Sequence, residues 1–272
     1  MSRKGGNGLR RLIVCADDAG WDVDNDDVVA ALASAARISA VSVLVDGPSA
    51  HDWADRALPA DCALGLHLNL TWTPERGSER LSSLLLAAYA RRLSSAEIRQ
   101  RINNQLQRFE RLFDRPPAFV DGHQHVHALP IVREQLLDRL RQRYGDDPRA
   151  RPAVRSTYAR RWRGVKPFAL NVLGGRELAN RLAALDWPCN RDFAGVYDFS
   201  ESQPYRQRVL RWLSSLADKG LIMVHPGVQT LTEHGEARAR EAAYLGSEDW
   251  LIDLASAGVS LQRFDASVGQ GP

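Results

Sequence analysis

The chain alternates short apolar runs with longer segments of helical periodicity, and this alternation restricts its fold more than any other feature. Residues 12–16, 41–45 and 62–68 are compact apolar runs, typical of strands that are buried on both faces. Segments 22–36 and 94–113 repeat apolar residues at helical spacing. Buried strands that are each followed by a helix indicate a parallel sheet with helices outside it.

The same alternation continues to the end of the chain. Its 272 residues and seven or so expected strands fit an α/β fold, in the form of a distorted or partly closed (β/α) barrel. An open doubly wound sheet is the alternative. Residues 1–10 are expected to form a flexible tail, and 11–272 a single catalytic barrel domain. Further strands are expected at 117–120, 153–155, 221–225 and 259–261, and further helices at 130–143, 176–185, 204–217, 236–245 and 247–257.

The composition argues against several classes of protein: nucleic-acid-binding, disulfide-rich and membrane-spanning. A net charge of +3 is too small to indicate a nucleic-acid partner. Three widely spaced cysteines argue against a disulfide framework and for a reducing compartment. The sequence has neither an apolar run near the ~18 residues of a membrane helix nor an apolar signal core, so we expect a cytoplasmic protein. Much of the basic excess lies in 149–163, where a solvated loop is the simpler interpretation and an anionic glycan or phospholipid surface the alternative.

The clearest chemical signal is the segment 121–127, which reads DGHQHVH and follows the apolar run 117–120 directly. It places one carboxylate and three of the seven histidines at alternate positions. Imidazole is the commonest ligand for borderline divalent metals, and Asp with His suits Zn, Mn, Fe or Mg. The segment therefore indicates a metal site, with a solvated His-rich turn as the plainer alternative.

Polar groups also follow the other expected strands. They are Asp17 and Asp18, His67, Arg155 and His225. Because the carboxyl ends of parallel strands meet at one rim, these groups should converge on a metal-dependent active site. Neighbouring side chains on a strand face opposite ways, so one aspartate could reach a metal while the other takes a proton from water. Taken singly, the aspartate pair could be a helix cap or turn, and His67 a core histidine.

Four motifs in this order resemble the YdjC family of carbohydrate deacetylases, which includes chitooligosaccharide and hopanoid-associated deacetylases. The resemblance spans about residues 11–263 and implies a distorted (β/α) barrel that removes acetyl groups from N-acetylated sugars, as free oligosaccharides or glycolipids. It also implies a divalent metal ion, Mg or Zn, and a homodimer as a possible assembly. The motifs are Ala16-Asp17-Asp18-x-Gly20, the GLHLNLT of 65–71, the DGHQHVH of 121–127 and the VHPG of 224–227.

The resemblance implies a role for each matching residue. Asp18, His67 and His123 resemble an Asp-His-His metal triad. Asp17 resembles the general base that deprotonates the metal-activated water. His225 resembles the catalytic acid, or the histidine on the oxyanion side of the site.

Other residues receive supporting roles. His125 and His127 are expected beside the substrate or the metal ligands, and could share a face with His123 if the segment were extended. Arg155 is matched to a strand-end arginine that holds either Asp17 or a substrate oxygen. Trp72 could stack on a sugar ring or simply pack, and His234 is expected to be a surface histidine.

The chain departs from the family pattern without losing a proposed metal ligand. Ala19 and Trp21-Asp22 replace the usual aromatic and Leu-Ser, and Gly122 replaces a common serine. These changes bear on the shape of the substrate pocket. Two other functions stay open at this point: a metal-dependent phosphoesterase on the same barrel, using arginines of 149–163, and a catalytically silent sugar- or lipid-binding protein.

Overall fold

In the part of the chain that the structure describes, the central sheet has eight parallel strands, seven of them in one continuous path. The computed structural model describes residues 8–74, 77–199, 203–230 and 234–269, so the expected tail falls mostly on residues outside this description. The strands follow the order β7-β6-β3-β2-β1-β9-β8, and β10 pairs with the amino-terminal part of β1. Every pairing in this sheet is parallel, as the alternation predicts. The bounds are β1 Arg10–Ala19, β2 Ala40–Val43, β3 Ala63–Leu68, β6 Phe119–Gly122, β7 Ala153–Val154, β8 Asp192–Ala194, β9 Gly220–Val224 and β10 Val259–Leu261.

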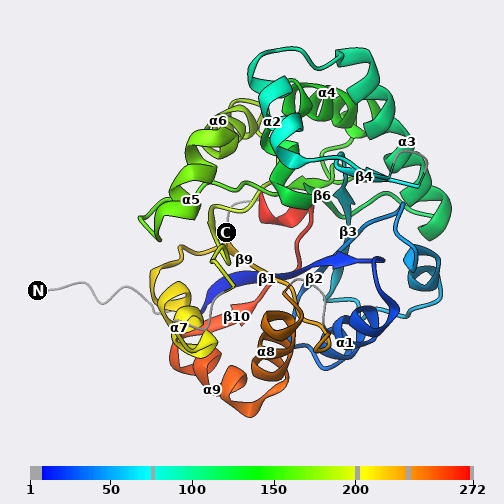
Figure 1. Cartoon of the computed structure of the whole chain (residues 1–272). Helices are drawn as coiled ribbons and strands as arrows, with labels where there is room; N and C mark the ends of the chain where they lie inside the picture. The colour runs from blue at the N-terminus through cyan, green and yellow to red at the C-terminus, as the bar shows by residue number, and fades with distance from the viewer. Residues whose placement is uncertain (1–7, 75–76, 200–202, 231–233, 270–272) are drawn as a thin grey trace, which may run out of the picture.

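The sheet curls until its two edges approach one another. The backbone N–H of Val154, on β7, donates to the carbonyl of Pro188 at 2.8 Å. Val154 also forms a parallel bridge with Cys189, shortly before β8. The result is a half-barrel with helices around it (Figure 1), which is the expected partly closed barrel and not the open doubly wound sheet.

Helices cover the outside of the half-barrel (Figure 1). Two of them, α2 and α5, were not expected from the sequence, and neither was β8. These elements are short, and α5 contains a proline, so they carry too little local pattern to be recognised. The helices are α1 Val23–Ser34, α2 Leu81–Tyr89, α3 Ser95–Phe113, α4 Val132–Tyr144, α5 Val165–Leu170, α6 Arg176–Ala184, α7 Tyr205–Ser215, α8 Gly235–Gly246 and α9 Glu248–Ser256. Shorter elements are η1 Ala50–Ala54, η2 His123–Ala128, the π-helical η3 Asn171–Gly175, η4 Ala266–Val268 and the hairpin of β4 Trp72–Thr73 and β5 Gly77–Ser78.

Strand alternation separates two apolar layers. On β1, Leu12 and Val14 belong to the layer under the helices, whereas Ile13 and Cys15 belong to the interior of the half-barrel. Phe119 and Phe264 fill this interior, with ring centroids 4.7 Å apart. The amino-terminal part of the interior is therefore solid core, so a cavity inside the half-barrel is expected toward the carboxyl ends of the strands.

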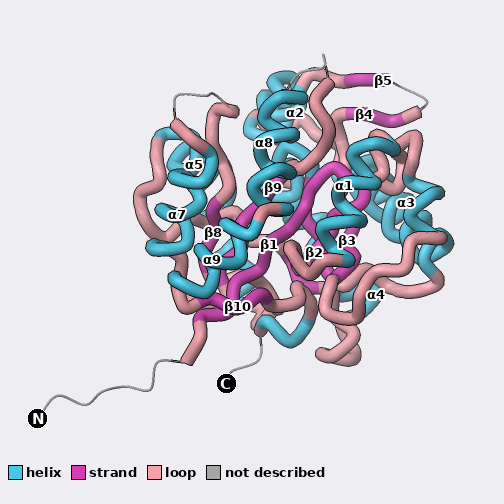
Figure 2. Tube along the Cα trace, turned by 90° about the horizontal axis from the view of Figure 1, so that it is seen from below, coloured by secondary structure: helices cyan, strands magenta, loops and turns pink. Residues whose placement is uncertain are grey.

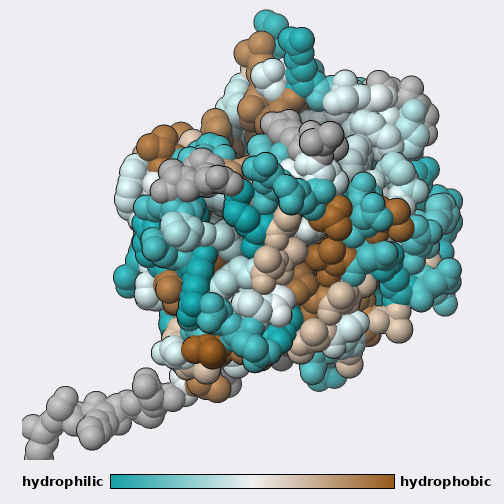
Figure 3. Space-filling model, turned by 60° about the horizontal axis from the view of Figure 1, so that its bottom comes forward, coloured by the Kyte–Doolittle hydropathy of each residue, from teal (hydrophilic) through white to brown (hydrophobic). Residues whose placement is uncertain are grey.

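The two ends of the molecule differ accordingly. Figure 2 shows β10 at one end and the β4–β5 hairpin, which follows the carboxyl end of β3, at the other. On the face drawn in Figure 3, hydrophobic residues form a short band right of the centre, surrounded by hydrophilic ones. Within the described part of the chain, no helix combines the length and apolar character that crossing a membrane requires.

The tight interior gives a first prediction. A Cβ atom on Gly65 would lie 2.5 Å from ring carbons of Phe119. We expect Gly65→Ala to destabilise the protein by about 1–3 kcal/mol because the core must shift to admit the methyl group. Thermal unfolding followed by circular dichroism measures this loss. The control is Gly246→Ala on α8, where the nearest atom is a Leu32 methyl at 3.9 Å; its melting temperature should be unchanged or higher. Equal melting temperatures for the two variants would contradict the proposed overpacking.

Candidate active site

The candidate site is the last inward-facing layer of the half-barrel. Asp17 stands two positions after the core residue Cys15, and Asp121 two positions after Phe119. Because side chains alternate along a strand, each polar residue continues the interior column below it. The same spacing from interior residues places Ser42, His67, Arg155 and His225 in this layer.

Part of this layer lines a cavity of about 550 Å³. All five residues matched to a catalytic or metal-binding role line it together, namely Asp17, Asp18, His67, His123 and His225, and His125 lines it too. They come from β1, from β3, from η2 immediately after β6, and from the residue after β9. The convergence expected from the strand order is therefore present in the fold.

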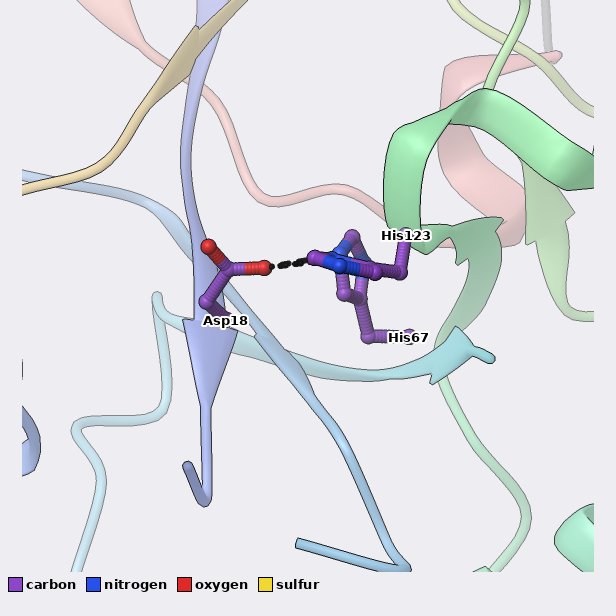
Figure 4. A group of neighbouring side chains, drawn as sticks. All are labelled: Asp18, His67 and His123. Atoms are coloured by element: carbon purple, nitrogen blue, oxygen red, sulfur yellow. Dashed lines mark hydrogen bonds and ion pairs between the residues drawn. The ribbon is translucent and has the colours of Figure 1, made fainter. Parts of the chain in front are cut away.

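Asp18 reaches the cavity through an irregularity in β1. The strand was expected to end before the aspartate pair, but it continues through Ala19. Its register against β2 shifts between Ala16 and Ala19, and Asp18 has a φ of 63°. A bulge of this kind re-aims a side chain that regular alternation would direct outward. Asp18 thereby faces His67 and His123 (Figure 4).

Asp18, His67 and His123 are a candidate donor set that could hold a metal ion. Asp18 Oδ1 lies 2.9 Å from His123 Nδ1 and 3.3 Å from His67 Nε2, and the ligand atoms of all three residues lie within 4.8 Å of one another. Two imidazoles and one carboxylate are a usual donor set for a divalent transition metal. Asp121 Oδ1 lies 2.6 Å from His67 Nδ1, which fixes the ring with Nε2 toward the cavity, as carboxylates do for metal-binding histidines.

The same contacts set the charges of these groups. Burial favours neutral Asp18, but hydrogen bonds from His123 and His67 hold its pKa well below the ordinary value. Burial lowers the pKa of His67, but the charge and hydrogen bond of Asp121 outweigh it and raise that pKa to about 10. A divalent metal bound here would take the place of the proton that His67 holds toward Asp18, because a metal-binding imidazole must be neutral.

A buried arginine organises the other half of the site. Arg155 Nη1 donates to Asp17 Oδ2 at 2.6 Å, and Nη2 lies 2.5 Å from Asp17 Oδ1 and 2.5 Å from Asp121 Oδ2. Of the two partners considered for Arg155, the structure thus provides Asp17. Cys15 and the two carboxylates also lie close enough to share an ion, but the Arg155 guanidinium already supplies the positive charge there. Burial lowers the pKa of Arg155, but the charges of Asp121 and Asp17 raise it well above its ordinary value.

The three histidines of 121–127 point to different places. Gln124 and His125 have φ values of 52° and 61°, so the chain turns after His123 and the extended arrangement does not occur. His127 is completely buried, with Nε2 2.9 Å from the Arg155 carbonyl, and burial lowers its pKa to about 4. The His125 ring lines the cavity and packs edge-on against Phe193 at 5.7 Å.

Helix α8 contributes two groups that the sequence analysis missed. Arg238 donates to Asp18 Oδ2 at 2.6 Å. Glu241, completely enclosed, accepts from the backbone N–H of His225 at 2.5 Å and from the Tyr197 hydroxyl at 2.6 Å. A three-residue spacing indicates one helix face, but nothing in the local pattern shows that this face meets the aspartate 220 residues away.

Ser42 is a third site residue that the sequence analysis missed, although strand alternation marks its position. It donates to Asp121 Oδ1 at 2.5 Å. As an isolated serine two positions after Ala40 in an apolar strand, it follows the same alternation that marks the other site residues. The orienting role of Asp121 follows from that alternation too.

The last two residues named from the sequence are His234 and Trp72. His234 is exposed, as expected of a surface histidine, but it also lines the cavity, and its ring stacks on Phe199 with centroids 4.3 Å apart. Trp72 packs edge-on against Trp21 at 4.9 Å and is not among the described residues that line the cavity.

Comparison with known proteins places the chain in a family. The model for YdjC-like proteins matches residues 11–256. The chain belongs to the YdjC family. A Mus musculus relative named carbohydrate deacetylase is 34% identical over 167 residues, which cover 56% of this YdjC chain and 54% of the relative. A Serratia marcescens chitooligosaccharide deacetylase is 29% identical over 229 residues, 79% of this chain and 81% of that one.

The first of these matches is partial, and the fold comparison is more complete. The YdjC chain spans about half the length of the vertebrate relatives from Mus musculus and Homo sapiens. A solved structure from Enterococcus faecalis, described as a candidate cellobiose-phosphate cleavage protein, superposes with a TM-score of 0.72 at 16% identity. It covers 94% of this chain and 98% of its own, so the two share the fold along their whole lengths.

Because Arg155 pairs with two buried carboxylates, its replacement should lower the free energy of unfolding strongly. Arg155→Met leaves Asp17 and Asp121 buried without their shared positive charge. We expect a loss of about 3–5 kcal/mol in the free energy of unfolding, measured by urea denaturation. Arg11→Met is the matched control. The side chains of Arg11 and its partner Asp218 are 40% and 37% exposed, so water screens the charges of this pair. A similar loss in both variants would contradict a special role for the buried pair.

Glu241 predicts a pH dependence of stability. Burial raises its pKa above the ordinary value of 4.5. Its contribution to stability is therefore complete below about pH 4.5 and is lost as the pH rises through the folded-state pKa. As the pH increases from about 4 to about 7, the melting temperature of the wild type should therefore fall relative to that of Glu241→Gln. Glu248→Gln, at a side chain that is 81% exposed, is the control. A constant difference between wild type and Glu241→Gln across this range would disprove the assignment.

Proposed function

We propose that this YdjC-family chain is a carbohydrate deacetylase, a metal-dependent hydrolase that removes acetyl groups from N-acetylated sugars. The observation that carries the proposal is one cavity that joins an Asp-His-His donor set to a second carboxylate held by a buried arginine. The names of the mouse and Serratia relatives support sugar as the substrate class and acetyl as the group removed.

The chain's own residues divide the proton transfers between them. A divalent metal held by Asp18, His67 and His123 would supply Lewis acidity to the attacking water and the amide carbonyl. Asp17 takes the proton from this water. Arg155 holds both oxygens of Asp17, which fixes the carboxylate in place beside the donor set. His225, at the cavity end of β9, gives a proton to the departing sugar amine.

Other lining residues suit a sugar ring. Phe199 lines the cavity and packs edge-on against His225 at 5.7 Å, so we assign the aromatic contact to Phe199 in preference to Trp72. Two imidazoles suit zinc better than magnesium, which prefers oxygen ligands, so we propose zinc first. The cytoplasmic location and the homodimer stay predictions from the sequence.

The two other functions have less support. A phosphoesterase was expected to use arginines of 149–163, but Arg155 is engaged by two carboxylates and Arg163 by Asp192. Among the described residues, no arginine of that segment lines the cavity. A silent binding protein would have little use for Asp17 beside a metal donor set.

Two substitutions separate the base from the metal ligands. Asp17→Asn should lower the rate of acetate release from N-acetylglucosamine oligomers by about 10²–10⁴-fold and leave the bound metal unchanged, because it removes only the proton acceptor. His123→Ala should lose both metal and activity. Acetate assays and elemental analysis of the purified protein measure the two effects.

The control is Asp52→Asn, at an exposed aspartate on η1, which should behave as wild type. Acetate release by Asp17→Asn at the wild-type rate would remove Asp17 from the mechanism. Metal binding without acetate release from any sugar tested, together with phosphate release from an aryl phosphate, would favour the phosphoesterase.

A further inference from the structure

Exposed apolar side chains cluster around α5. Trp162, Val165, Phe168 and Val172 have 70%, 73%, 53% and 67% of their surfaces exposed. The Trp162 and Phe168 ring centroids lie 5.5 Å apart, so the two aromatic side chains form one patch. Single exposed apolar residues are ordinary, but a contiguous group of large ones marks an interaction site.

The segment that carries this patch is strongly basic, and the nearest acidic residue after it, Glu177, lies in α6 and pairs with Arg181. No acidic residue occurs between Asp147 and Glu177, whereas the interval holds eight lysines and arginines. Five of these are exposed, and three of the five are Arg161, Lys166 and Arg176. No acidic side chain in the described part of the chain pairs with any of the three. Their charge is therefore available to an external anion.

Charge and apolar surface occupy the same place in the fold. Arg161, Trp162, Phe168, Val172 and Arg176 all border one surface hollow of about 530 Å³. With Val165 and Lys166 on the adjoining helix, we call these seven residues the α5 surface. Figure 1 shows α5 at the outer edge of the molecule, where a flat partner can reach it.

The α5 surface also adjoins the candidate active site. Lys166, Ala169 and Leu170 line the catalytic cavity, whereas Phe168 on the same helix borders the outer hollow. Figure 2 places α5 toward the end of the molecule with the β4–β5 hairpin, away from β10. A partner seated on the α5 surface would thus lie next to the mouth of the cavity.

We propose that the α5 surface docks on an anionic lipid bilayer. Tryptophan and phenylalanine insert at the level of the headgroups, and flanking arginine and lysine bind anionic lipid, a combination characteristic of proteins that lie on a membrane without crossing it. A soluble polyanion would satisfy the cations but leave Val165 and Val172 without a partner. The docking proposal stands independently of the reaction in the cavity.

Co-sedimentation of the full chain with vesicles tests the proposal. We expect binding to vesicles of phosphatidylcholine mixed with phosphatidylglycerol, little binding to phosphatidylcholine alone, and weaker binding at high salt. The double variant Trp162→Ala/Phe168→Ala removes the inserting rings, and Arg161→Glu/Arg176→Glu reverses two charges. Each should weaken binding to the anionic vesicles by about tenfold or more.

Matched variants elsewhere on the surface control for charge and hydrophobicity. Leu251→Ala/Ile252→Ala removes two exposed apolar side chains of α9, and Arg92→Glu/Arg115→Glu makes the same charge change at exposed positions. Both should bind as wild type. Circular dichroism confirms that all four variants are folded.

Three outcomes would overturn the proposal. One is an absence of sedimentation with anionic vesicles at low salt. Another is an equal loss of binding in the α5 and control variants, which would reflect net charge or general surface hydrophobicity. The third is binding to heparin or RNA that depends on Arg161 and Arg176 while vesicles are ignored, which would assign the surface to a soluble polyanion.

Discussion

The candidate site depends on one buried ionic contact, the Arg155 guanidinium between Asp17 and Asp121. It ties β1 to β6 across the interior of the curled sheet, from a side chain that follows the edge strand β7. A buried charge is tolerated only when an opposite charge lies beside it, and here one guanidinium pairs with two carboxylates. Asp121 in turn orients His67, so the contact that positions the proposed base also positions a proposed metal ligand.

The site includes several irregular backbone positions. Asp18, Gln124 and His125 all have positive φ values, although none of them is glycine. Such conformations cost free energy, and they persist when the surrounding structure holds them. The regular parallel strands below provide that support. The bulge at Asp18 and the turn after His123 then bring together three donors that a regular strand and an extended loop would separate.

Two helices connect the site to the rest of the molecule. From α8, Arg238 contacts the second oxygen of Asp18 and Glu241 supports the backbone of His225, so this helix braces both proposed ends of the reaction. From α5, one side borders the cavity and the other carries the exposed basic and aromatic patch. The candidate active-site cavity and the proposed membrane-facing surface are therefore neighbours along a single short helix.

Local patterns in the chain were enough to predict the parallel α/β class, most strands and the residues Asp17, Asp18, His67, His123 and His225 as one cluster. Periodicity and strand-end position depend only on near neighbours, so they can be read from a sequence. The closure between Val154 and Cys189, the bulge at Asp18, the divergence of the three histidines and the contact of Arg238 with Asp18 could not be read in this way. Each depends on contacts between residues far apart in the chain. These contacts form, and stabilise the structure, only in the folded barrel.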